Sequence, residues 1–110
     1  MICAMLESPL KGDYERNRSY ARACMRDALV VHGEAPFAMH LLYAQEGILE
    51  DKNPEERKLG IAAGLEWSHK ADAVLVYTDL GITEGMEIAI ERATSRRIPI
   101  VYRNGVWRPE

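Results

Sequence analysis

Apolar residues follow two different periodicities along this chain, and the order of these periodicities predicts the fold class. Short, nearly unbroken apolar runs indicate buried strands, which we expect over residues 1–6, 35–39, 72–77 and 99–103. Between these runs apolar residues recur every three or four positions, which indicates helices over residues 13–31, 53–69 and 83–96. Strands that alternate with helices are typical of an α/β sheet with parallel strands.

The expected architecture is a single domain over residues 1–110, because a chain of this length buries one ordinary core. We predict a three-layer, Rossmann-like open sheet of four parallel strands in the order 2-1-3-4, with helices on both faces. Asn104-Gly105 is a two-residue turn signal, so a short C-terminal strand is expected over Val106–Arg108. Residues 40–51 are expected to be mostly loop, with His40 ending the second strand.

Polar residues with known capping preferences mark where the helices begin. Asp13 is placed to cap the first helix, and Gly33 ends it. Asn53 and Pro54 open the second helix, with Glu56 three residues after Asn53 as in a capping box. The positions expected to face inward are Tyr20, Ala21, Cys24, Ala28 and Val31 in the first helix and Leu59, Ala62, Ala63 and Trp67 in the second.

Composition and charge narrow the classes of function. A net charge of −3 argues against a nucleic-acid polymer as partner, since polymers require a basic face. No stretch approaches the roughly 18 uninterrupted apolar residues of a membrane span. Cys3 and Cys24 lack CxxC spacing and lie in apolar patterns, which favours buried thiols in a reduced, cytoplasmic protein.

Two polar loops are expected to meet where the strand order reverses, which is where open α/β sheets bind ligands. These loops are residues 7–13 and 78–85, and each leads into a helix N-terminus that favours a phosphate. Neither loop has a Walker A or G-x-G-x-x-G sequence, and turn geometry alone also accounts for their Gly, Ser and Asp residues. The candidate ligand-binding residues are Ser8, Lys11, Gly12, Asp13, Asn17, His40, Asp79, Gly81, Thr83 and Gly85.

The roles of three of these candidates, and of a row of glutamates on one helix, can be interpreted in more than one way. Asp79 either accepts from ribose hydroxyls or caps its turn, and Asn17 faces either the crevice or solvent. His40 has no partner at metal-ligand spacing, so no metal site is expected. The glutamates at positions 84, 87 and 91 share one helix stripe, which is either a solvated face or a source of a catalytic nucleophile or base, with Glu87 and Glu91 as candidates.

Nearly the whole chain resembles the nucleoside 2-deoxyribosyltransferase-like group, which includes nucleoside 5'-monophosphate N-glycosidases and many small uncharacterised bacterial and phage domains. The resemblance lies in the order and spacing of five segments, which are ICAMLESPLKGD, YERNRSYARACM, APFAMHLLYAQ, PEERKLGIAAGLEWSHKADAVLVYTD and GITEGMEIAIERATSRRIPIVY. It implies a nucleotide ligand at the strand-order reversal, no cofactor and homo-oligomers. It also adds Met86, in the "GM" helix start, to the candidate ligand-binding residues.

The resemblance also implies where a catalytic residue belongs. The enzymes of the group attack C1' of a deoxyribosyl unit with a glutamate four residues after the helix-opening glycine. Counting from Gly85, that position is Ala89, which cannot act as a nucleophile or base. Three functions therefore stay open: N-glycosidic hydrolysis or deoxyribosyl transfer, non-catalytic nucleotide binding such as a phage sponge for a cyclic nucleotide or cyclic ADP-ribose-type signal, and an interaction module that keeps only the fold.

Overall fold

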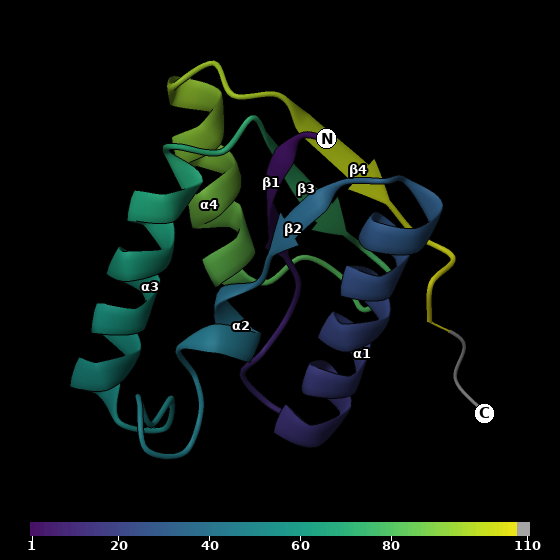
Figure 1. The fold of residues 1–110 in the computed structure, drawn as a ribbon. Coiled ribbons are helices and arrows are strands. Elements are labelled where there is room, and N and C mark those ends of the chain that lie inside the picture. Colours follow the sequence, from purple (N-terminus) through teal and green to yellow (C-terminus); the bar gives the residue numbers. More distant parts are fainter. Residues whose placement is uncertain (108–110) are drawn as a thin grey trace.

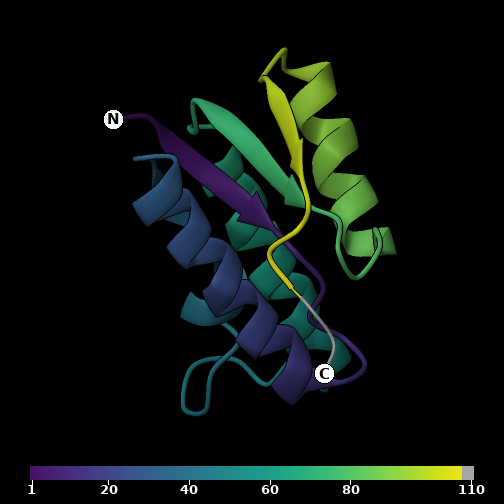
Figure 2. The same ribbon diagram turned by 90° about the vertical axis from the view of Figure 1, so that its right-hand side faces the viewer.

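A computed structural model describes residues 1–107 and has the α/β architecture expected from the sequence (Figures 1 and 2). Its elements are β1 (Cys3–Glu7), α1 (Tyr14–Arg26), the π-helical turn η1 (Asp27–Val31), β2 (Ala35–Phe37), α2 (Met39–Leu42), α3 (Pro54–Ser68), β3 (Ala73–Tyr77), α4 (Glu84–Ser95) and β4 (Ile100–Arg103). All strand pairs are parallel, and the sheet order is β2-β1-β3-β4. The predicted order 2-1-3-4 is therefore confirmed.

The core lies on both faces of the sheet, because helices cover both (Figure 1). On one face α1 packs Tyr20 and Cys24 against Leu6 and Leu75. On the other face α4 packs Met86 against β1 and β3, and α3 lies beside α4. Every residue of β3 is buried, which fits its continuous apolar sequence. Each fully buried leucine of this core contributes about 2 kcal/mol relative to an exposed one.

Side-chain caps start the helices at the predicted residues. The Asp13 carboxylate accepts a hydrogen bond from the Arg16 amide (3.1 Å), and the Thr83 hydroxyl accepts one from the Met86 amide (3.3 Å). Asn53 caps α3, with its side-chain oxygen 3.0 Å from the Glu55 amide. The capping box expected there is wrong, because the carboxylate that should close it, on Glu56, instead accepts from the backbone amide at position 50.

The first helix ends differently from the prediction. Its final residues form the π-helical turn η1, in which the His32 amide donates to the Asp27 carbonyl (3.2 Å). The extra residue in this turn rotates the side chains that follow. Ala28 stays buried, but Val31, expected to face inward, is 69% exposed.

The prediction of mostly loop over residues 40–51 missed the short helix α2. His40 lies inside α2 and does not end β2, which stops at Phe37. The Ala38 side chain cannot cap a helix, and α2 has no side-chain cap hydrogen bond. The usual signal for a helix start is therefore missing from the sequence.

The face that α3 buries is also not the predicted one. Gly60, Gly64 and Ser68 are buried, whereas Leu59 and Trp67 are 60% and 50% exposed. Ala62 is exposed and Ala63 is half-buried, so the inward assignments of Leu59, Ala62 and Trp67 are wrong. The glycines face inward because side chains fill the space in front of them, Leu49 closest to Gly60 and Met39 of α2 closest to Gly64.

No further strand follows β4 in the described residues. The amides of Gly105, Val106 and Trp107 donate to one oxygen of the Asp79 carboxylate, at 2.7, 3.1 and 3.3 Å. These amides are therefore not available to a sheet edge, and the hairpin expected after Asn104 does not form up to Trp107. Arg108, the last residue of that predicted strand, lies outside the described residues.

None of the helices found within residues 1–107 is both long enough and apolar enough to cross a membrane.

Candidate functional site

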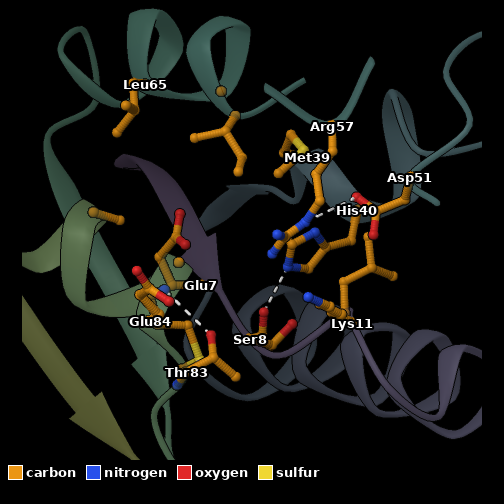
Figure 3. Close-up of a pocket in the computed structure, with 16 residues that line it drawn as sticks. Glu7, Ser8, Lys11, Met39, His40, Asp51, Arg57, Leu65, Thr83 and Glu84 are labelled. Atoms are coloured by element: carbon orange, nitrogen blue, oxygen red, sulfur yellow. Dashed lines mark hydrogen bonds and ion pairs between the residues drawn. The ribbon is translucent and has the colours of Figure 1, made fainter. Parts of the chain in front are cut away.

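A cavity of about 240 Å³ opens at the carboxyl ends of β1 and β3, where the strand order reverses (Figure 3). It is smaller than the roughly 300–1,000 Å³ of most small-molecule sites, so part of a nucleotide-sized ligand would lie outside it. The lining comes from the loop after β1 (Glu7, Ser8, Leu10, Lys11), from α2 (Met39, His40), from Asp51 and α3 (Arg57, Ile61, Gly64, Leu65) and from the start of α4 (Thr83, Glu84, Gly85, Met86, Ala89).

The cavity has two chemically different sides. Lys11, His40 and Arg57 lie together on one side of the close-up, and the carboxylates of Glu7 and Glu84 lie on the other (Figure 3). The acidic side is bordered by apolar groups of α3 and α4. Such a cavity suits a ligand with an apolar or planar portion and a separate anionic portion.

Glu7 is the last residue of β1, and its carboxyl group lies in the cavity beneath α3 and α4. No hydrogen bond or ion pair joins this carboxyl group to another described residue. Burial raises its pKa to about 8, so the group is largely protonated at neutral pH. A neutral carboxyl group both donates and accepts a hydrogen bond, which an ionised one cannot do.

Ser8 is buried and His40 is half-buried, and the two residues contact each other at the cavity wall. The His40 Nε2 lies 2.5 Å from the Ser8 carbonyl, which can only accept, so Nε2 carries the proton. Burial lowers the pKa of His40, and the Ser8 carbonyl only partly offsets this, so the ring is neutral at neutral pH. The Nδ1 of His40 and the Oγ of Ser8 are then buried with no hydrogen-bond partner among the described residues.

Lys11 and Arg57 supply the positive charge of the cavity. The Arg57 Nε lies 3.7 Å from the Asp51 carboxylate, whose other oxygen accepts from the Tyr14 hydroxyl (2.8 Å). No ion pair holds Lys11 within the described residues. The amine of Lys11 and most of the Arg57 guanidinium are therefore free to contact an anion.

The N-terminus of α4 closes the cavity on the β3 side. Thr83 caps the helix, and Glu84 follows with its side chain at the cavity wall. A Cβ added at Gly85 would meet only the Thr83 hydroxyl, at 3.9 Å, so the glycine keeps this wall open. The positive end of the helix dipole points toward the cavity and favours an anion there.

Six of the eleven predicted ligand-binding residues line this cavity: Ser8, Lys11, His40, Thr83, Gly85 and Met86. The other five do not. Gly12 and Gly81 are exposed turn residues with positive φ, and Asp13 caps α1. Asn17 is buried, with its amide donating to the carbonyls of Leu10 and Lys11, and so holds the loop after β1.

Asp79 lies away from the cavity lining, with both carboxylate oxygens in use. One accepts from the Tyr20 hydroxyl (2.7 Å), and the other accepts from the three amides after β4. Burial raises the pKa of Asp79, but these hydrogen bonds outweigh it and hold the pKa below its ordinary value. The carboxylate fastens the C-terminal segment to the end of β3.

The three glutamates of the α4 stripe, Glu84, Glu87 and Glu91, differ in their position relative to the cavity. All three glutamates are exposed, but Glu84 lines the cavity, whereas Glu87 and Glu91 lie outside the lining. Ala89 is 3% exposed and lines the cavity. Ala89 therefore presents a methyl group to the cavity.

Sequence reasoning missed Glu7, Asp51 and Arg57 as lining residues. Glu7 is the first residue of the loop 7–13, which we considered for phosphate binding as a whole. Its position directly after an apolar run places its carboxyl group at the end of a strand, and this was the signal that could have identified it. Asp51 and Arg57 gave no comparable signal. They lie on either side of the α3 cap, and only the packing of α3 beside α4 brings them to the cavity.

The family model for DUF7768, a domain of unknown function, matches residues 2–103. The chain belongs to this family. The match covers every lining residue of the cavity, so the cavity is part of the DUF7768 domain itself. No curated protein sequence matches the chain.

The described part of this DUF7768 domain contains no cluster of three or more His, Cys, Asp or Glu side chains arranged to hold a metal ion. The side chains that line the cavity offer several kinds of group. They offer cations and a helix N-terminus for an anion, unpartnered hydroxyl and imidazole groups for polar atoms, and a protonated carboxyl group beside apolar walls.

Proposed function

We propose that this domain binds a small nucleotide or nucleoside phosphate in the cavity at the carboxyl ends of β1 and β3. The observation that carries the proposal is the division of the cavity into a cationic side and an apolar side with a neutral carboxyl group. Lys11, Arg57 and the start of α4 are suited to a phosphate. The apolar side and Glu7 are suited to a base, whose edge offers both donors and acceptors.

The unpartnered groups of Ser8 and His40 support the same proposal. A buried polar group without a hydrogen bond costs about 1–3 kcal/mol, so a ligand that supplies the missing partner gains that amount on binding. The Nδ1 of His40 needs a donor, and the hydroxyl of Ser8 takes either role. Sugar hydroxyl groups meet both needs.

Binding without cleavage is the leading form of this proposal. The position matched to the nucleophile of the resembling enzymes is Ala89, and neither Glu87 nor Glu91 lines the cavity. A domain that keeps the binding groups and lacks the nucleophile would retain a nucleotide intact. Sequestration of a nucleotide signal, as by a phage sponge, is one biological use of such binding.

A second candidate, N-glycosidic hydrolysis, is favoured by the protonation of Glu7. Glu7 would donate its proton to the departing base as the bond between the base nitrogen and C1' breaks. Water would add its oxygen to C1' and give a proton to the carboxylate of Glu84, which lies on the same side of the cavity as Glu7. This route uses neither Glu87 nor Glu91.

A binding experiment tests the leading form. Nucleoside monophosphates and diphosphates are titrated calorimetrically into the protein and into Arg57→Gln, with Arg96→Gln as control because Arg96 is exposed and lies outside the cavity. We expect Arg57→Gln to weaken binding about tenfold and the control to bind as the parent does. If no nucleotide binds at millimolar concentration, the proposal is wrong.

Chromatography of the same mixtures separates binding from hydrolysis. Recovery of the intact nucleotide after the protein is denatured supports binding alone. Release of free base that Glu7→Gln abolishes and Glu87→Gln preserves supports the second candidate. Release that depends on Glu87 would contradict both forms, because Glu87 lies outside the cavity.

A further inference from the structure

A second hollow, of about 370 Å³, lies directly beside the first. The two share Lys11, Asp51, Arg57 and Ile61, so the cationic side of the first cavity is also a wall of the second. The residues found only in the second are Tyr14, Lys52, Pro54 and Lys58. A ligand that leaves the first cavity between Lys11 and Arg57 therefore enters the second.

The second hollow is strongly cationic. Four of its eight lining residues are basic, and Asp51 is the sole acid among them. The Asp51 carboxylate is already engaged by the Tyr14 hydroxyl and the Arg57 guanidinium. The second hollow is therefore locally positive, although the net charge of the chain is −3.

The two additional lysines are available to a ligand. The Lys52 ammonium lies 5.6 Å from the centre of the Tyr14 ring, a cation–π contact that keeps it over the hollow. Neither Lys52 nor Lys58 forms an ion pair with another described residue. Both lysines are exposed, and they line a concave wall that is continuous with the first cavity.

We propose that the ligand of this domain carries at least two linked phosphate groups. The first phosphate lies between Lys11 and Arg57, where the hollows meet, and the next lies against Lys52 and Lys58 in the second hollow. This inference rests on the proposed function and adds the number of phosphates to it. A monophosphate would leave the second hollow empty, whereas a diphosphate or a pyrophosphate-bridged dinucleotide would occupy both.

Simple anions test the phosphate count without knowledge of the base. Inorganic phosphate and pyrophosphate are titrated calorimetrically into the protein at fixed ionic strength and pH. The same titrations use the double variant Lys52→Gln/Lys58→Gln and the matched control Lys70→Gln/Arg96→Gln, which also removes two exposed cations but lies outside both hollows. Melting temperatures without ligand check that each variant is folded.

We expect pyrophosphate to bind the parent protein and the control at least about tenfold more tightly than phosphate, through the added charge-assisted contacts. The Lys52→Gln/Lys58→Gln variant should lose that preference and keep its affinity for phosphate. Equal binding of the two anions by the parent, or an unchanged preference in the variant, would overturn the inference.

Matched nucleotides separate this inference from the proposed function. If a nucleoside monophosphate binds as tightly as its diphosphate, the proposed function stands and the second phosphate site does not. If pyrophosphate shows the expected preference but no nucleotide binds more tightly than pyrophosphate, the phosphate sites stand and the nucleotide proposal fails. A dinucleotide whose two nucleosides are joined by a pyrophosphate bridge is titrated beside the nucleoside diphosphate. The one that binds more tightly is the source of the linked phosphates.

Discussion

At the scale of single residues, the raised pKa of Glu7 should make the stability of the protein depend on pH. Burial disfavours the charged form and raises the pKa of the Glu7 carboxyl group from 4.5 to about 8 in the folded protein. Between these values the folded chain holds a proton that the unfolded chain has released. The free energy of unfolding therefore decreases as the pH rises through this window and levels off above about 8.

The first prediction is that Glu7→Gln flattens this pH dependence. Glutamine has the shape of the protonated acid and cannot ionise, so the variant should lose less melting temperature than the parent between pH 5 and pH 8. Thermal unfolding monitored by circular dichroism across that range measures the difference. Glu87→Gln, which changes an exposed glutamate, should follow the parent, and a parallel course for Glu7→Gln and the parent would refute the assignment.

Single residues also show where sequence reasoning succeeds. Short-range capping rules predict Asp13 and Asn53 at helix starts, and each accepts the expected backbone hydrogen bond. Glu7 and Asp79 could not be assigned in that way. Both follow apolar strands, but one faces a cavity and the other binds the amides after β4, and only the packing of distant segments decides between these outcomes.

At the scale of elements, α3 and α2 explain why the burial of one helix face was mispredicted. Periodicity favoured the face with Leu59 and Trp67, but the structure buries the glycines at 60 and 64. A glycine face allows close approach, and Met39 of α2 fills the resulting space. Because α2 has no side-chain cap, its start lacks the usual sequence signal, and α2 is the element that makes the glycine face the inner one.

The second prediction concerns the contact between α3 and α2. A Cβ at position 64 would lie 3.1 Å from the Met39 Cγ, so Gly64→Ala should gain little of the roughly 1 kcal/mol that alanine normally adds in a helix. In the Met39→Ala background the Cγ is gone, and Gly64→Ala should stabilise the protein by about that amount. Chemical denaturation of the four proteins in this cycle measures the coupling. Equal effects of Gly64→Ala in both backgrounds would show that Met39 does not limit the approach.

At the scale of the whole molecule, the cations that line the two hollows act within a chain whose net charge is negative. A phosphate about 4 Å from a lysine near the surface gains about 4 kcal/mol, whereas a like charge about 20 Å away across water costs only about 0.2 kcal/mol. The cations lining the two hollows should therefore dominate over the net charge of −3. Composition reports the net charge of the chain, but it cannot report how charges are distributed among cavities.

The third prediction follows from this balance. Raising the ionic strength from about 0.05 M to about 0.5 M should weaken phosphate and nucleotide binding, because salt screens the attraction at the cavity mouth. Lys52→Gln/Lys58→Gln should show a shallower salt dependence for pyrophosphate than the parent does. Affinity that increases with salt would mean that repulsion from the rest of the molecule dominates. Calorimetric titration at four or more salt concentrations distinguishes the two signs.

The parallel strands give the molecule two functionally distinct ends, and the two cysteines differ accordingly. Cys3 is exposed at the start of β1, about 13 Å along the strand from Glu7 at its end. Cys24 is fully buried, and burial raises its thiol pKa to about 12, so it does not compete for thiol reagents. A maleimide dye or surface linker should therefore attach at Cys3 alone and leave the cavity facing solution, which allows the titrations above to be performed on immobilised, uniformly oriented protein without any engineered cysteine.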